Sequence, residues 1–483
     1  MSDTPASPPL LGEMPGAEFR AAGYAVIERI AEYLEQPQRW RVLPETRPGD
    51  VAAALPPGPP EQGEPMTRIL ADYDRLIPPN TTHWNHPGFF AYFGITGSAP
   101  GILAEALTAA LNVNAMLWRS GPAATELEQV TLGWLRSLLG LPADLDGHIN
   151  DTASSSTLVA LAAAREAQAD LRVREEGLAG RPEVPRLRVY CSEEAHSSVD
   201  KGVLTLGLGL SGVRRLPTDS ELRLDVAALE RAVAEDRAAG IRPIAVVATV
   251  GTTSTTSIDP VRPIAELCRR EGMWLHVDAA YGGAGAVLPE LRHLYDGWEL
   301  ADSIVMNPHK WLFTPIDCSA LFVRRPEIVK RAFSLVPEYL TTPQGDAVRN
   351  LMDYGVALGR RFRALKLWFV LRYYGSLGLQ ARIREHVRLA RLFAGWVDAD
   401  PRFERLAPTP LSTVVFRHRP PGASEESADA SSMRLLERLN ATGEVFLSHT
   451  RVKGRYGLRL AIGNIRTTEA HVTRAWELVQ ALV

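Results

Sequence analysis

Four short apolar segments of the sequence each end in, or lead into, a polar or reactive side chain. In chain order these side chains are His196, Thr253, Asp278 and Lys310. Because ligands bind at the carboxyl ends of the strands in an open α/β sheet, we expect the four to converge on one edge. A lysine close to a carboxylate suits pyridoxal phosphate, an aldehyde that forms a Schiff base with a lysine and needs an acidic partner for its pyridine nitrogen. The pattern therefore predicts a pyridoxal phosphate site.

A phosphate group needs its own binding site, and residues 151–156 (DTASSS) are the candidate. They precede the helical pattern of residues 157–165, so small hydroxyl side chains open a helix. Backbone N–H groups and the helix dipole at such an end attract an anion. Serine and threonine at helix starts are more often simple caps, so this segment is a weak indication when taken alone.

Each candidate also has a purely structural explanation. A lysine is usually a solvated surface charge, but the apolar residues 302–306 and 311–313 bracket Lys310 and indicate a buried site. Asp278 could be a strand-end cap or turn former, although its place after a mostly apolar run favours a functional role. His196, taken alone, is more often a structural residue.

The segment THWNHPGFFAYF combines two histidines with several aromatic side chains. His83 and His86 invite a metal interpretation, but without a carboxylate or a third histidine nearby we expect no metal site. The aromatic residues are most simply core. The sharper hypothesis is that Trp84, Tyr92 and Phe93 form a wall of the substrate pocket.

Short, β-rich apolar runs alternate with helical patterns from about residue 97 onward. The runs are residues 187–191, 244–250, 273–278, 302–306 and 319–323. Their nearly continuous apolar character is typical of strands covered on both faces, and strand–helix alternation predicts an α/β fold with a mostly parallel sheet. Long helical patterns at 348–395, later strand-like runs and a polar loop at 420–432 fit a small α+β C-terminal domain.

Composition and charge exclude several classes of protein. The chain has 483 residues, 46% hydrophobic and 23% charged, which excludes a disordered or fibrous protein. Its net charge of −3 gives no general footprint for nucleic acid or an anionic membrane. Three scattered cysteines argue against a disulfide framework, and we recognise neither a signal peptide nor an apolar span. We therefore expect a cytoplasmic protein that binds neither nucleic acid nor membranes.

Several sequence blocks resemble the group II pyridoxal-phosphate-dependent decarboxylases, and among them the aromatic-L-amino-acid decarboxylases. The blocks are THWNHPGFFAYF (82–93), AHSSVDKG (195–202), GTTSTTSIDP (251–260), HVDAAYGG (276–283) and NPHKW (307–311). The resemblance extends from about residue 12 to the C-terminus with the blocks in the same order. It implies decarboxylation of an aromatic L-amino acid, similar to tryptophan, phenylalanine, tyrosine or dihydroxyphenylalanine, to the amine and carbon dioxide.

The resemblance also implies roles for individual residues. Lys310 matches the Schiff-base lysine, and Asp278 the partner of the pyridine nitrogen. The two faces of the cofactor ring would be covered by His196 and Ala280. The phosphate would be held by Thr152, Ala153, Ser154 and Asn307. Thr253 would face cofactor and substrate, and His309 would lie beside the lysine.

Further positions concern the proton donor and the substrate ring. Tyr339, in the segment PEYL, matches the tyrosine of a mobile loop, and we expect it to be the catalytic proton donor. Gly359 matches a position at which plant relatives with indolic substrates tend to carry glycine. Asn114 and Met116 stand where animal members carry isoleucine and phenylalanine that face the substrate across the dimer.

The implied architecture is a fold-type-I, aspartate-aminotransferase-like homodimer with a seven-stranded type of sheet. The expected parts are an N-terminal helical arm packing on the dimer partner (1–96), a large cofactor domain (97–375) and a small α+β domain (376–483). Three alternatives stay open: an oxidative aldehyde synthase on the same scaffold, a decarboxylase for a non-aromatic amino acid, and a catalytically silent scaffold. The intact set of Lys310, Asp278 and His196 argues against the last of these.

Overall fold

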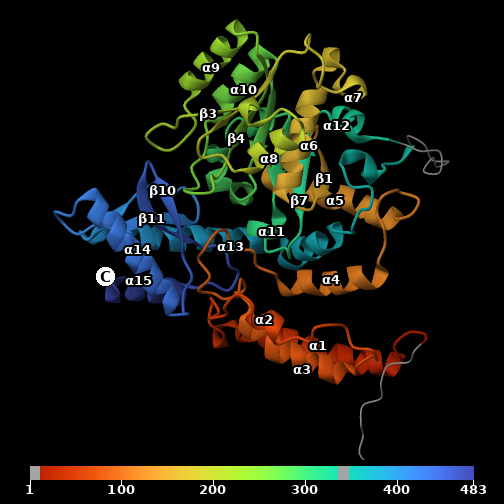
Figure 1. Cartoon of the computed structure of the whole chain (residues 1–483), viewed down its shortest axis with the longest axis vertical. Coiled ribbons are helices and arrows are strands. Elements are labelled where there is room, and N and C mark those ends of the chain that lie inside the picture. Colours follow the sequence, from red (N-terminus) through yellow and green to blue (C-terminus); the bar gives the residue numbers. More distant parts are fainter. Residues whose placement is uncertain (1–10, 336–346) are drawn as a thin grey trace, which may run out of the picture.

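The computed structural model describes residues 11–335 and 347–483, which form an N-terminal arm, an α/β body and a small C-terminal part (Figure 1). The helices of the arm are α1 (Gly16–Glu35), α2 (Asp50–Ala53) and α3 (Met66–Leu76). They lie apart from the α/β body in Figure 1. Not one residue of α1 is buried, although the helix carries Phe19, Tyr24 and Ile27. The arm thus has an apolar surface that its own chain leaves uncovered.

The α/β body is built on one seven-stranded sheet. Its strands are β1 (Asp146–Asn150), β2 (Leu187–Ser192), β3 (Val213–Leu216), β4 (Arg242–Thr249), β5 (Trp274–Asp278), β6 (Ser303–Met306) and β7 (Ser319–Val323). Their order is β1-β7-β6-β5-β4-β2-β3. β7 is antiparallel to both of its neighbours, and the other paired strands are parallel. Six strands therefore end at the same edge of the sheet.

Helices cover both faces of this sheet. The helices of the α/β body are α4 (Ala99–Leu111), α5 (Pro122–Leu139), α6 (Ala153–Glu166), α7 (Val173–Glu176), α8 (Ser198–Thr205), α9 (Val226–Ala238), α10 (Val261–Glu271), α11 (Pro308–Trp311) and α12 (Pro326–Phe333). Alternate residues of β4 face opposite sides: Val246 and Ala248 join a core with α5, α9 and α10, whereas Ala245 and Val247 join one with α6, α8 and α12. This confirms the expected α/β fold with strands buried on both faces.

The C-terminal part has a sheet of its own. Its elements are α13 (Ala364–Ala399), β8 (Phe403–Arg405), β9 (Thr413–His418), α14 (Glu425–Ala441), β10 (Ser448–Val452), β11 (Arg455–Ala461) and α15 (Glu469–Ala481). The strand order β10-β11-β9-β8 is antiparallel throughout. The long helix α13 is interrupted at Gly375, whose φ of 62° is left-handed and favours glycine. The division at residue 375 into two domains stays a prediction.

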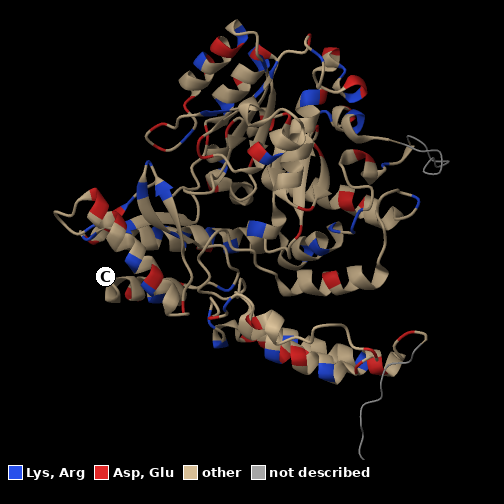
Figure 2. Ribbon diagram, viewed as in Figure 1, with Lys and Arg blue, Asp and Glu red and all other residues tan. Residues whose placement is uncertain are grey.

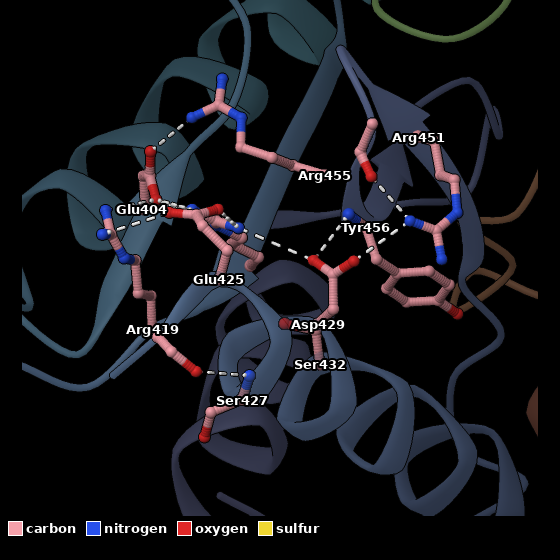
Figure 3. Close-up of polar contacts among 12 residues, drawn as sticks. Glu404, Arg419, Glu425, Ser427, Asp429, Ser432, Arg451, Arg455 and Tyr456 are labelled. Atoms are coloured by element: carbon pink, nitrogen blue, oxygen red, sulfur yellow. Dashed lines mark hydrogen bonds and ion pairs between the residues drawn. The ribbon is translucent and has the colours of Figure 1, made fainter. Parts of the chain in front are cut away.

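An ion-pair network holds α14 on this small sheet (Figure 3). Arg417 of β9 is fully buried, and its guanidinium pairs with Glu404 on β8 and with Glu425 on α14, both at 2.7 Å. Asp429, one turn further along α14, accepts hydrogen bonds from Arg451 and from the backbone N–H of Tyr456. A buried arginine is costly unless it is paired in this way.

The polar segment 420–432, expected to be a loop, is helical from Glu425 onward. The Ser424 hydroxyl caps the helix by accepting the N–H of Ser427 at 3.2 Å, and Glu425 and Glu426 in the first turn suit the helix dipole. The loop prediction was wrong for residues 425–432, because their polar side chains cap the helix, suit its first turn or, like Asp429, join the ion-pair network.

Charged residues of both signs are interspersed over the ribbon drawn in Figure 2. Among the described residues, we find no helix with enough consecutive apolar residues to cross a bilayer.

Candidate active site

The loops after β5 and β6 are joined by backbone hydrogen bonds. The N–H of Ala279 donates to the carbonyl of Val305 at 3.0 Å, and the N–H of Asn307 donates to the carbonyl of Ala280 at 3.1 Å. Asp278 ends β5, and Lys310 lies in the short helix α11 that follows β6. The structure therefore brings the predicted acid and lysine to neighbouring positions at the edge of the sheet.

Lys310 has the environment of a reactive amine. Its Nζ lies 5.3 Å from the centre of the Phe93 ring. Burial lowers the pKa of this amine, the charge of Asp278 partly opposes that effect, and Arg459 adds to it. A lysine with a lowered pKa is more often neutral and can attack a carbonyl group.

Asp278 is held by its own strand and by the loop after it. It is 6% exposed, and its Oδ1 accepts the N–H of Ala280 at 3.0 Å. His276 lies two residues earlier, on the same face of β5, and burial lowers its pKa to about 4. The Nδ1 of His276 lies 2.9 Å from the hydroxyl of Ser303, which also accepts the indole N–H of Trp274. The buried side chains that precede Asp278 on this face of β5 are thus linked to each other through the hydroxyl of Ser303.

His196 lies in the turn between β2 and α8. Its Nδ1 accepts the backbone N–H of Ser198 at 3.1 Å, which leaves Nε2 as the ring nitrogen without that bond. Partial burial lowers the pKa of His196, the charge of Asp278 raises it, and that of Lys310 lowers it. The charges of Asp278 and Lys310 thus both act on the His196 ring, as expected if these three side chains surround one ligand.

The candidate phosphate site lies at the start of α6. Thr152 is the N-cap residue, and its side chain makes no capping hydrogen bond to the first-turn N–H groups in the described part of the chain. Asn150, two residues before Thr152, is opposite Ser319 of β7, and Met306 of β6 is opposite Ala320 of β7. Only the strand β7 therefore lies between the start of α6 and Asn307. The start of α6 and Asn307 therefore belong to one region of the sheet edge.

These residues suit the phosphate of pyridoxal phosphate. The Oδ1 of Asn307 is buried and has no hydrogen-bond partner among the described residues, so this amide is free to turn its Nδ2, the donor that a phosphate oxygen needs, toward a ligand. Uncapped N–H groups at a helix start are natural anion donors. Ala153 is buried and Ser154 is partly buried at this end. Ser156 is already engaged, because its hydroxyl bonds to Asn150 and Ser319.

Ala280, His309 and Thr253 occupy three different environments. Ala280 is buried directly after the Asp278 strand. His309 is buried and accepts the N–H of Cys318 at 2.9 Å, and burial lowers its pKa to about 4. Thr253 is exposed in the loop after β4. His309 thus fixes α11 to the start of β7, and Thr253 is accessible to a ligand.

A column of stacked rings supports the lysine, and most of it was missed by the sequence analysis. Phe93 stacks on Tyr281 with centres 3.7 Å apart, and Tyr281 stacks on Trp311 at 4.8 Å. The Trp311 N–H donates to Nδ1 of His386 on α13 at 2.9 Å. Both Tyr281 and Trp311 belong to quoted sequence blocks, but nothing in their spacing indicated a stack.

Arg459 is the other residue that the sequence analysis missed. It lies in β11, is 3% exposed, and places its guanidinium 4.4 Å from the centre of the Phe93 ring. Its Nε donates to the carbonyl of Ser254 at 3.1 Å and its Nη1 to that of Tyr92. Burial lowers its pKa to about 10. The sequence did contain one indication of this residue, because Arg459 lies within the otherwise apolar run GLRLAIG.

Among the described residues, no carboxylate compensates the charge of Arg459. Its Nη2 is buried without a hydrogen-bond partner, and within residues 11–335 and 347–483 no carboxylate forms an ion pair with it. Buried charges are normally paired. The site therefore offers a fixed cation to an anionic ligand, close to Lys310.

Several predicted residues make contacts elsewhere or lie outside the described residues. Trp84 stacks with Tyr92, and Tyr92 packs on the edge of Phe446, so their part in a substrate pocket stays a prediction. Gly359 is exposed, and a Cβ there would lie 3.9 Å from Nδ2 of Asn114. Tyr339 falls in 336–346, outside the described residues.

The histidines of the same sequence block have protein partners. The nitrogens of His83 lie 3.0 Å from the hydroxyl of Tyr33 and 2.9 Å from the carbonyl of Pro78. His86 accepts the N–H of Gly88 at 2.9 Å. These bonds account for His83 and His86 as structural residues.

Comparison with known proteins agrees with this geometry. Residues 48–419 match the pyridoxal-dependent decarboxylase conserved domain. An aromatic-L-amino-acid decarboxylase of Sus scrofa is 39% identical over 97% of each chain. The structure of Oryza sativa TDC with PLP and tryptamine superimposes with a TM-score of 0.93, at 38% identity, over 98% of this chain and 99% of that one. A 4-hydroxyphenylacetaldehyde synthase of Rhodiola rosea gives a TM-score of 0.90, at 33% identity, over 97% and 98%.

The domain match and these similarities cover nearly the whole chain, including every strand end described above. A lysine with a lowered pKa, a carboxylate beside it and an uncapped helix start are the groups that pyridoxal phosphate requires. The chain therefore belongs to the pyridoxal-dependent decarboxylases, as an amino-acid decarboxylase whose cofactor is pyridoxal phosphate.

Proposed function

We propose that this enzyme converts an aromatic L-amino acid to the corresponding amine and carbon dioxide. The observation that carries the proposal is Arg459, a buried cation without a carboxylate partner, on the same aromatic ring as Lys310. An amino acid brings the missing carboxylate, and Phe93 places the two cationic side chains around one ring. The similarity to decarboxylases of aromatic amino acids supports this choice.

The cofactor, when bound to Lys310, supplies an electron sink for the electron pair left by departing carbon dioxide. Asp278 would hold a proton on the pyridine nitrogen, because a buried anion favours the charged form of its partner. His196 would cover one ring face, and the small Ala280 would leave room on the other. Thr152, Ala153, Ser154 and Asn307 would hold the phosphate, with His309 and Thr253 at the flanks.

Orientation decides which bond of the substrate breaks. Arg459 fixes the carboxylate from β11, on the small sheet, while Lys310 lies on the large sheet. Two anchor points on different sheets would fix the direction of the carboxylate relative to Lys310, and this orientation would select the bond that breaks. The stacked rings of Phe93 and Tyr281 keep water from this part of the site.

We propose that Tyr339 donates the proton that replaces the carboxyl group. Its segment connects α12 with the turn at Leu351–Tyr354, and Ser334 bonds to Asp353 across that connection at 2.8 Å. The described residues on either side of Tyr339 are therefore joined where α12 packs on α6. A phenol brought to the reacting carbon can act as a general acid.

We also propose that the enzyme is a homodimer, with the arm of each chain covering its partner. Leu103, Leu107 and Leu111 of α4 recur every four residues and are 51%, 50% and 64% exposed. Monomers rarely leave such a stripe uncovered. Sedimentation should give the mass of two chains, and Leu107→Glu should shift the protein toward the monomer. A wild-type mass of one chain would contradict the dimer.

Oxidative aldehyde synthesis is the second candidate, since an aldehyde synthase shares the fold at 33% identity. The two reactions differ in their products, because the oxidative one consumes dioxygen and releases ammonia and hydrogen peroxide.

The test is carbon dioxide release from each of the twenty amino acids, dihydroxyphenylalanine and 5-hydroxytryptophan, with oxygen uptake recorded in parallel. We expect release from aromatic substrates without oxygen uptake. Release from acidic or aliphatic substrates alone would contradict the proposed substrate class.

A further inference from the structure

The turn that carries His196 depends on a side chain from the neighbouring strand. Within the turn, the N–H of Ala195 bonds to the carbonyl of Ser192 at 3.1 Å. The carbonyls of Ser192, Glu193 and Ala195 all receive Nη1 of Arg215, at 3.1, 3.4 and 3.2 Å. One guanidinium nitrogen thus gathers three carbonyl groups that immediately precede His196.

The same guanidinium also holds the helix that follows the turn. Nη2 of Arg215 donates to Oδ2 of Asp200 in the first turn of α8, at 2.6 Å. Arg215 lies in β3 and is paired in register with Cys191 at the end of β2. Arg215 therefore holds both segments that flank His196: the turn residues before it and helix α8 after it.

This clamp needs the shape of an arginine. Arginine has several N–H donors in a rigid plane, whereas lysine has one flexible charged group. The preceding residue, Arg214, points to the other side of the strand and bonds to Ala232, Glu235 and Asp236 of α9. The two neighbouring arginines therefore form a matched pair, with only Arg215 attached to the turn of His196.

We infer that Arg215 is a positioning residue that sets the height and tilt of the His196 ring over the cofactor. The inference rests on the proposed role of His196 against pyridoxal phosphate. The His196 ring is oriented by one hydrogen bond of its own, which its Nδ1 accepts from the N–H of Ser198. The position of the ring is thus determined mainly by the backbone that Arg215 holds.

The test measures the dissociation constant of pyridoxal phosphate, by absorbance titration, for Arg215→Met, His196→Ala, the double variant and Arg214→Met. We expect Arg215→Met to weaken binding about 10-fold and the double variant to be no weaker than His196→Ala, since residues of one network are coupled. Arg214→Met should bind as the wild type does. Circular dichroism checks the fold of each variant.

Equal losses in Arg214→Met and Arg215→Met would overturn the inference, because they would reflect damage to β3 in general. Additive losses in the double variant would also overturn it, since Arg215 would then act independently of His196. If Arg215→Met does not fold, Arg215→Lys and Asp200→Asn provide the same comparison with His196→Ala. A folded wild type that binds no pyridoxal phosphate would instead refute the proposed function itself.

Discussion

Replacing Arg459 by methionine tests whether the uncompensated cation binds the substrate carboxylate. A charge-assisted hydrogen bond contributes about 1.5–3 kcal/mol, and each 1.36 kcal/mol is about tenfold. We therefore expect kcat/KM for the amino acid to fall by about 10- to 150-fold in Arg459→Met. The amine product lacks the carboxylate, so its inhibition constant should change little.

The stability of the variant separates binding from structure. Arg459→Met loses the hydrogen bonds to Ser254 and Tyr92, at about 1.5–3 kcal/mol each because the donor is charged. It also removes a charge without a carboxylate partner among the described residues, whose burial costs several kcal/mol. The two effects oppose each other, so the midpoint of thermal unfolding should change little.

The assay compares substrate kcat/KM and amine inhibition for the wild type, Arg459→Met and Arg455→Met. Arg455 lies on the same strand but pairs with Glu404 in the ion network (Figure 3), so it is the matched control. Equal losses of affinity for amino acid and amine would refute the role of Arg459 in carboxylate binding, as would an unchanged kcat/KM.

Three further predictions concern the proton donor, the pocket for the substrate ring and the buried histidine His386. Tyr339→Phe should slow amine formation by about 10²- to 10⁴-fold. It should also increase the yields of aldehyde, ammonia and peroxide while the affinity for the cofactor stays unchanged. Amine formation at the wild-type rate without peroxide would rule Tyr339 out as the donor. Gly359→Ser should fold normally, because its Cβ would lie at an ordinary contact distance of 3.9 Å from Asn114. The variant should lower the ratio of kcat/KM for indolic substrates to that for phenolic substrates by about tenfold. An unchanged ratio would exclude Gly359 from the substrate pocket. Burial lowers the pKa of His386 to about 4, so the unfolded chain binds this proton first and stability falls as pH drops from about 6.5 toward 4. His386→Asn should make urea unfolding free energies depend less steeply on pH, by about 1.36 kcal/mol per pH unit; an unchanged slope would contradict a neutral His386.

The sequence allowed the cofactor edge of the sheet to be predicted because its strands are continuous apolar runs. All five predicted runs of the large sheet are strands, and Asp278, Lys310 and His196 follow them as expected. Strand β1 was not recognised, since DGHIN is polar in composition although His148 and Ile149 are fully buried. Local pattern fails where a short strand obtains its burial from neighbours far along the chain.

Long-range contacts account for what the sequence analysis missed at the site. Arg459 comes from β11 and meets Phe93 and Lys310 only because the small sheet packs on the large one. The column of Phe93, Tyr281 and Trp311 likewise joins three distant segments. Spacing along the chain contains no information about such stacking, although the residue types were in view.

The central claim is that Lys310 holds the cofactor, and borohydride reduction followed by peptide mapping tests it most directly. The chain has five lysines: Lys201, Lys310, Lys330, Lys366 and Lys453. Lys366 is a strict internal control, because it is 1% exposed and paired with Glu105. We predict that reduction in the presence of pyridoxal phosphate labels Lys310 alone, and that Lys310→Ala remains folded, unlabelled and inactive. A label on another lysine, or turnover by Lys310→Ala, would contradict the account.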